Sequence, residues 1–228
     1  MRAQFIPVLA ICACGLPAMA GTILFSDLGA SGTIYTANSG NVVDGSTAGL
    51  TPFSLATADL FPVSGAGTFS VSEIDLAVAA FGSSANHTFT ASIWTDNAGL
   101  PGSQVAGASW SLSTSDPFFA CCSLVSVTGV SGVNLAGGQQ YFMILAPPSL
   151  TGTSSVIWNG NNQGATGLQL ASVNGGTFGG TIGGSPIGNT LSAFDVVGTS
   201  VPEPGSLLLL GTGLIGMLAL CRGKPHRA

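Results

Sequence analysis

The central part of this sequence contains no lysine and no arginine, from Gly21 to Ser200. All four basic residues lie in the two tails, and charged residues make up only 6% of the chain. Neutralising nucleic-acid phosphates takes Lys or Arg, so this composition excludes a nucleic-acid partner. With eight acidic and no basic side chains, the span has a formal charge of −8; the acids are Asp27, Asp44, Asp59, Glu73, Asp75, Asp96, Asp116 and Asp195.

Residues for metal binding and catalysis are also scarce. His87 is the only histidine of the span, whereas a zinc site needs three or four clustered ligands and a hydrolytic nucleophile needs a neighbouring base. The sequence has no Gly-x-Ser-x-Gly elbow and no Asp-x-Asp-x-Asp-Gly calcium loop, although a looser calcium site stays open. We therefore expect a protein that is not an enzyme and has no metal or other cofactor.

One pair of acids keeps a hydrolase open as the alternative. Glu73 and Asp75 share a face of a predicted strand, which separates them by about 7 Å. That separation is compatible with the paired carboxylates of a glycosidase. A solvated strand face explains the same pair more simply.

Cysteine is nearly absent from the span as well. Cys121 and Cys122 are its only two cysteines, and they are adjacent. In an oxidising compartment they could form a strained vicinal disulfide, form an intermolecular bridge, or remain thiols. The sequence does not decide among the three.

The N-terminus has the three parts of a secretory signal peptide. Arg2 supplies the positive charge, and residues 5–16 form an apolar stretch that is too short to span a bilayer. Ala18 and Ala20 then supply the small-x-small pattern that signal peptidase recognises. We predict that residues 1–20 are a signal peptide and that the chain is exported.

The C-terminus predicts a membrane anchor over residues 201–228. Residues 206–220 carry no charge, and Arg222, Lys224 and Arg227 follow as a membrane stop. A helix of that run covers about 22 Å, which extension to about residue 221 and snorkelling bring closer to the ~30 Å bilayer core. The positive-inside rule leaves the tail in the cytoplasm and residues 21–200 outside.

The same tail resembles the PEP-CTERM sorting signal of exopolysaccharide-producing Gram-negative bacteria. The resemblance rests on Pro202, Glu203 and Pro204, followed by the leucine-rich run and the short basic end. The two prolines keep Glu203 in an extended backbone that a protease can grip. The resemblance implies an exosortase substrate, held first in the inner membrane and then released to the cell surface or extracellular matrix. A permanently anchored protein is the alternative.

The pattern of residues 21–200 predicts a series of short strands. Residues 73–78 and 88–93 alternate between apolar and polar with period two, which predicts strands with one buried face. Residues 141–146, 156–158 and 194–197 are further candidates, and no window shows a helical stripe. We predict a single all-β domain, an antiparallel β-sandwich or jelly roll.

Residues that are typical of turns lie between these predicted strands. We expect turns at residues 96–99, 100–102 and 136–138, and a glycine-rich flexible loop over residues 174–188. A phosphate-binding role for that loop would need a following helix and usually a lysine, and both are lacking.

Parts of the span are similar to the β-sandwich ectodomains called choice-of-anchor domains, which often precede such tails. The similar stretches are ASIWTDNAGLPGSQVAGASWSL, GVNLAGGQQYFMILAP and VIWNGN. By analogy of fold with carbohydrate-binding modules, we take Trp94, Trp110 and Trp158 as candidate glycan contacts, because aromatic rings stack on sugars. The expected function is structural, adhesive or glycan-associated, with signal peptidase, exosortase and exopolysaccharide as partners.

Overall fold

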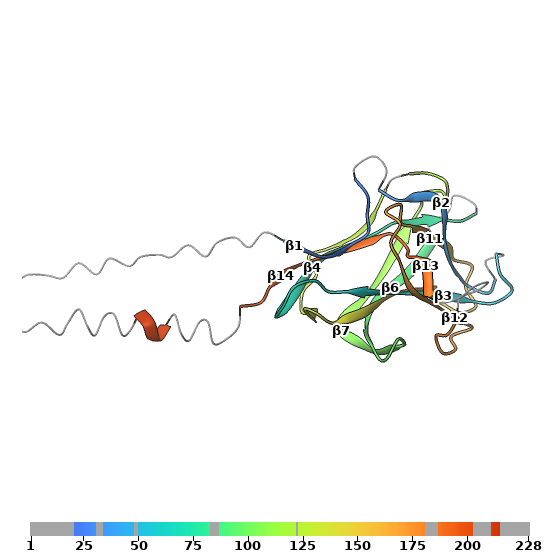
Figure 1. Ribbon diagram of the computed structural model, residues 1–228. Coiled ribbons are helices and arrows are strands. Elements are labelled where there is room, and N and C mark those ends of the chain that lie inside the picture. The colour runs from blue at the N-terminus through green and yellow to red at the C-terminus, as the bar shows by residue number, and fades with distance from the viewer. Residues whose placement is uncertain are drawn as a thin grey trace, which may run out of the picture.

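The protein is described by a computed structural model that covers residues 21–30, 34–47, 50–82, 87–121, 123–180, 187–202 and 211–214. Its strands form antiparallel sheets that curl into a half-barrel (Figure 1). The all-β antiparallel prediction is confirmed, and the finer choice between sandwich and jelly roll stays a prediction.

The smaller sheet has five strands in the order β1-β14-β4-β8, with β9 also paired to β4. Their bounds are β1 Thr22–Ser26, β4 Thr68–Leu76, β8 Val125–Thr128, β9 Asn134–Ala136 and β14 Phe194–Ser200. The first strand of the body, β1, and its last strand, β14, are thus neighbours. The two ends of the body, Gly21 and Pro202, emerge on the same side (Figure 1).

The larger sheet has nine strands in the order β5-β11-β2-β3-β10-β6-β7, and β12 joins β3 and pairs with β13. Their bounds are β2 Thr36–Asp44, β3 Leu55–Pro62, β5 Val78–Ala80, β6 His87–Asp96, β7 Pro101–Thr114, β10 Gln140–Ala146, β11 Ser155–Gly160, β12 Thr166–Val173 and β13 Ile187–Thr190. Bulges interrupt the pairing of β6 with β7 after Ser92 and after Trp94.

The main core lies where the inner faces of the two sheets meet. Phe194 of the smaller sheet packs edge-on against Phe61 of the larger sheet, with ring centroids 5.4 Å apart. Trp158 is fully buried beside them, and its indole N–H donates to the carbonyl of Ala193 at 3.2 Å. Burying one such side chain contributes roughly 1.5–3 kcal/mol, so this cluster dominates stability.

Strand β6 shows how period two divides the larger sheet into two faces. Phe89, Ala91 and Ile93 are fully buried in the main core, as their alternation predicts. The residues between them face the opposite side of the sheet, where a second, smaller cluster of four buried residues forms: Ala58, Phe142, Ile144 and Leu170. Both faces of this sheet are therefore partly covered.

Two predicted turns match the structure and two predicted segments differ. Residues 97 and 100 close a turn between β6 and β7, and a turn lies at residues 137–138. Pro101 and Gly102, expected in a turn, instead begin β7, because Pro101 pairs with Asp96. The expected loop at 174–188 ends earlier, since β13 begins at Ile187 and pairs with β12.

The tails fall mostly outside the described residues. The segments that the structure does not describe include the predicted signal peptide at 1–20, Glu203 and Pro204, and the basic stop at Arg222, Lys224 and Arg227. Of the predicted transmembrane helix at about 206–221, residues 211–214 are described, and they are helical. Within the part of the chain that the structure covers, no helix has the length and apolar character to cross a membrane.

Three aspartates of the described body are buried, Asp27, Asp44 and Asp59, and the body has no Lys or Arg to pair with them. Two of them, Asp27 and Asp59, repel each other. The carboxyl of Asp59 is fully buried and accepts hydrogen bonds from the Gln169 side chain at 2.9 Å and the Ser192 N–H at 2.7 Å. Asp27 accepts one bond, from the Phe194 N–H at 2.8 Å, and its other oxygen has no partner. Burial, with repulsion from Asp59, raises the pKa of Asp27 to about 7, and burial raises the pKa of Asp59 to about 6.

These pKa shifts predict that the body is stabilised by acid. Because the pKa of Asp27 is higher in the folded state than its ordinary value of 3.8, stability is greatest near pH 4 and is lost as the pH rises through 7. A shift from 3.8 to about 7 corresponds to a loss on the order of 4 kcal/mol at pH 8. Asp27→Asn removes the charge but keeps an acceptor for Phe194, so we expect a higher urea midpoint at pH 8.

The matched control is Asp116→Asn, which changes an aspartate outside this buried pair. Urea denaturation at pH 5 and pH 8 should show a clearly larger gain for Asp27→Asn at pH 8 than at pH 5, and no such rise with pH for the control. Equal effects of Asp27→Asn at both pH values would contradict the role of its ionisation.

Candidate functional site

A cavity of about 590 Å³ lies on the outer face of the larger sheet. Its floor is built from register partners on neighbouring strands: Ser172 of β12 lies opposite Ala56 of β3, and Ile144 of β10, Ser92 of β6 and Ser109 of β7 form a row. Side chains directly opposite each other in a pleated sheet share a face, so pairing alone brings this row together. The volume lies within the usual range for small-molecule sites.

A small hairpin after β12 forms one wall of the cavity. Asn174 at its tip has φ 53°, and it is held to Ser54 by two bonds of 2.9 and 3.0 Å, one through backbone and one through its side-chain oxygen. Gly175 follows with φ +70°, and a Cβ there would lie only 2.9 Å from Leu150. The Ser172 hydroxyl also donates to the Gly176 carbonyl at 2.6 Å. The hairpin is thus fixed in place above the floor.

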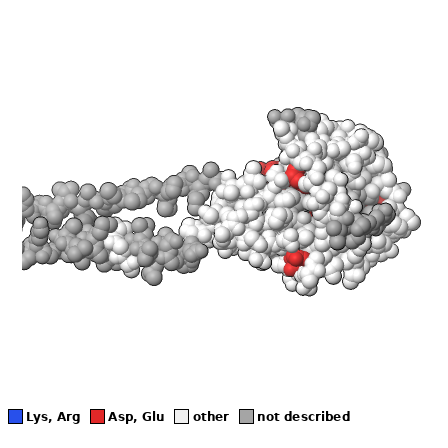
Figure 2. Space-filling view, viewed as in Figure 1, with Lys and Arg blue, Asp and Glu red and all other residues white. Residues whose placement is uncertain are grey.

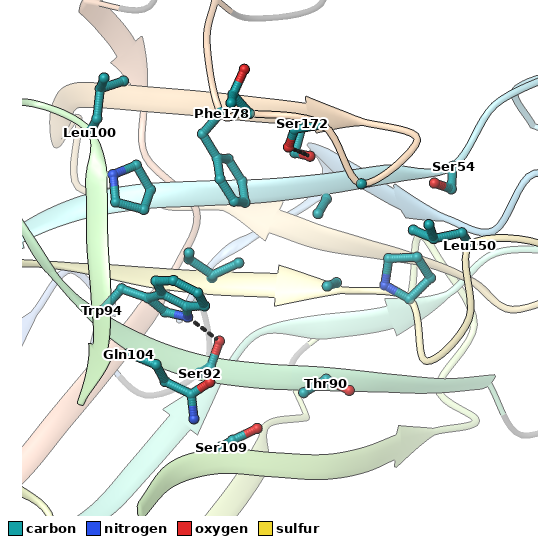
Figure 3. Close-up of a pocket in the computed structure, with 18 residues that line it drawn as sticks. Ser54, Thr90, Ser92, Trp94, Leu100, Gln104, Ser109, Leu150, Ser172 and Phe178 are labelled. Carbon is teal, nitrogen blue, oxygen red and sulfur yellow. Dashed lines mark hydrogen bonds between the residues drawn. The ribbon is translucent and has the colours of Figure 1, made fainter. Parts of the chain in front are cut away.

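Two aromatic side chains point into the cavity from opposite sides (Figure 3). Trp94 comes from β6 and Phe178 from the hairpin after β12, and both pack against the small apolar cluster of the floor. The indole N–H of Trp94 donates to the Ser92 hydroxyl at 3.0 Å, which fixes the ring orientation. Both side chains are half-buried, so part of each ring is available to a ligand.

Two exposed leucines mark the ends of the cavity. Leu100 and Leu150 are each 48% exposed, Leu100 on the turn between β6 and β7 and Leu150 on the loop after β10. Pro101 and Pro147 lie next to them along the wall. Apolar side chains thus line both ends of the cavity, while the Trp94 and Phe178 rings lie between them (Figure 3).

The polar groups of the cavity are all uncharged. Hydroxyls and one amide come from three strands, from the residue before β3 and from the hairpin: Ser54, Thr90, Ser92, Gln104, Ser109, Ser172 and Thr177. None of the described residues that line the cavity is Asp, Glu, Lys, Arg or His. Acidic atoms form only a few separate spots on the face of the body in Figure 2, and its described residues show no basic atoms there. An ionic ligand would find no counter-charge in this cavity.

The structure separates the three tryptophans that we took as candidate glycan contacts. Trp94 lines the cavity, but Trp158 has no exposed surface and therefore cannot stack on a ligand. Trp110 is half-buried and packs against the main core. Trp94 shares the cavity with Phe178, which the sequence analysis did not single out.

The candidate acidic pair lies away from the cavity, on the smaller sheet. Asp75 is paired directly opposite Asp195 across β4 and β14, and it accepts a hydrogen bond from the Ser126 hydroxyl. Burial, followed by repulsion from Asp75 and Glu73, raises the pKa of Asp195 to about 7. None of these three acids lines the large cavity. Among the described residues there is also no cluster of three or more His, Cys, Asp or Glu that could hold a metal.

The remaining candidate residues are His87, the two cysteines and the Pro-Glu-Pro motif. His87 begins β6, and its ring nitrogen Nδ1 accepts a hydrogen bond from the Ser155 N–H at 3.0 Å. Cys121 is exposed and disulfide-bonded. Cys122 lies outside the described residues, so the vicinal bridge stays a prediction. Pro202 is the one residue of the Pro-Glu-Pro motif that the structure describes, and it is exposed.

Comparison with known proteins identifies the tail. Residues 200–223 match the PEP-CTERM protein-sorting motif, so the predicted sorting signal is confirmed. A search of curated protein sequences finds no match to the chain. The motif indicates an exported, surface-directed protein that an exosortase processes.

The repulsion between Asp75 and Asp195 predicts that removing the charge of Asp75 changes the pKa of Asp195. Asp75→Asn removes the opposing charge, so the pKa of Asp195 should fall below 7 but stay above 3.8 because burial remains. Carboxyl carbon chemical shifts followed from pH 3 to 9 would measure it. Asp96→Asn, on the distant turn between β6 and β7, should leave the titration of Asp195 unchanged. An unchanged titration in Asp75→Asn would mean that the carboxyls do not interact.

Proposed function

We propose that this protein is an exported surface or matrix protein whose body binds a neutral polysaccharide in the cavity between Trp94 and Phe178. The observation that carries the proposal is a cavity with two aromatic rings, many hydroxyls and no charged lining residue. Residues 200–223 supply the export and sorting part of the function.

Aromatic rings and hydroxyls suit the two kinds of surface on a sugar. The ring faces of Trp94 and Phe178 can stack on the apolar C–H face of a pyranose, where burial of apolar area is favourable. The hydroxyls and the amide of Gln104 can exchange hydrogen bonds with sugar hydroxyls, which are also uncharged. The fixed orientation of the Trp94 indole reduces the entropy lost on binding.

The charge of the body favours neutral over acidic polymers. A uronate or sulfate group in the cavity would lose hydration without gaining a cation. The eight acids of the body, unopposed by any Lys or Arg, would also repel an anionic chain at low salt. The proposal therefore specifies an unsubstituted, neutral polysaccharide.

Binding without turnover is the chemistry that these side chains support. Hydrolysis of a glycosidic bond needs two carboxyl groups flanking the bond. The described lining of the cavity contains none, and the pair at Asp75 and Asp195 lies on the other sheet. We therefore propose a structural or adhesive protein rather than a glycosidase. Release of new reducing ends, lost in Asp195→Asn, would favour the hydrolase instead.

Replacing the indole tests the proposed binding site. Trp94→Ala should weaken binding to a neutral glucan roughly tenfold to a hundredfold, a loss of about 1.4–2.7 kcal/mol. Trp94→Phe should retain part of the affinity because a ring remains. Affinity gel electrophoresis with the glucan in the gel would measure all three chains.

Trp110→Phe is the matched control, because its indole contacts the core rather than the cavity, and it should bind like the wild type. A polyuronate gel should not retard the wild-type protein. Equal retardation of the wild type and Trp94→Ala by the glucan would refute binding at this cavity.

A further inference from the structure

The folded body and the sorting motif are almost continuous in the chain. β14 ends at Ser200, which pairs with Phe69, and the Val201 N–H still donates to the Thr68 carbonyl at 2.8 Å. The Pro-Glu-Pro motif begins at the next residue, Pro202. From Val201 to Glu203 an extended chain spans at most about 7 Å. An enzyme that holds Glu203 is therefore at the surface of the body.

The body cannot supply much more chain by releasing β14. This strand lies between β1 and β4, and its residues Phe194 and Val196 are fully buried. Gly198 is packed so closely that a Cβ would lie 2.7 Å from the Ser70 carbonyl and 2.8 Å from Leu24. Only residues 199–201 could separate from the sheet without opening the core, which adds about 10 Å of reach.

The segments beside this exit carry small, uncharged residues. We call residues 64–67 and 136–138 the exit rim; they flank the first residue of β4, to which Val201 is bonded. Its two segments are held together, since the Gly137 N–H donates to the Gly67 carbonyl at 2.7 Å. Ala66 is exposed and lies between Gly65 and Gly67, and the exit rim itself carries no side chain larger than that of Ser64. Such small side chains let another protein approach the backbone closely.

We propose that the exit rim is a docking surface for the exosortase that processes the tail. This inference rests on the sorting motif at residues 200–223 and is independent of glycan binding. The short connection forces the enzyme against the body, and the rim is the surface that it meets first. The low, hydrogen-bonded rim positions the motif at a fixed distance from the sheet, so the body takes part in substrate recognition.

A bulky charge on the rim tests this proposal in the full-length chain. Ala66→Arg should slow removal of the tail about tenfold, because a small displacement of the substrate from the active site is enough to do so. Ala120→Arg is the matched control; it also changes an exposed alanine, which lies near the opposite end of β4, and should be processed normally. Pulse-chase labelling in an exosortase-producing host, with mass spectrometry of the products, gives the rates.

A linker distinguishes docking from misfolding. Six Gly and Ser residues inserted between Ser200 and Val201 add up to about 20 Å of reach, so they should restore processing of Ala66→Arg. Processing of Ala66→Arg at the wild-type rate would overturn the proposal and favour release of residues 199–201. Slow processing that the linker does not relieve would overturn it too, because the defect would then lie in folding. A wild-type chain that keeps its tail would overturn the sorting function itself, whereas glucan binding would be unaffected.

Discussion

The body folds without a single basic side chain, and this constraint shapes its interior. A buried carboxylate normally gains stability from a nearby Lys or Arg, but here the only donors are N–H and O–H groups of the backbone and of uncharged side chains. Asp59 is satisfied in this way by Gln169 and Ser192, whereas Asp27 keeps one oxygen without a partner. The fold therefore depends on its backbone ladders and apolar core, and its buried acids are retained at a cost that grows with pH.

Much of the architecture could be predicted from residues with clear period two. The alternation around Ile74 and Ile93 predicted their strands and buried faces, because burial on one side of a pleated sheet leaves that pattern, but Val78, expected in the strand of Ile74, belongs to β5 of the larger sheet. Strand β2 (TANSGNVVD) was missed, since it is rich in small polar residues and is half-exposed. Pairing with distant strands, rather than local preference, holds it in the sheet.

The cavity was only partly predictable, again because pairing between distant strands, rather than local sequence, brings its residues together. The polar face of β6 and Trp94 on it can be recognised in the sequence, but the neighbours of Trp94 depend on register. Ile144 and Ser172 reach the same cavity only through pairing across β3 and β10. Phe178 had no signal of its own, because it lies in a glycine-rich stretch that predicts a flexible loop. Hydrogen bonds between Asn174 and Ser54 hold the hairpin that carries it.

The central position of β14 in the smaller sheet has a mechanical consequence. The tail leaves directly from this strand, and hydrogen-bonded neighbours, β1 and β4, flank it on both sides. A pull on the C-terminal end along the strand axis would load both ladders in shear, so many hydrogen bonds would have to break together. A strand at the edge of a sheet, peeled from one side, would open one bond at a time. The tail therefore leaves the body from a strand that resists such a pull better than an edge strand would.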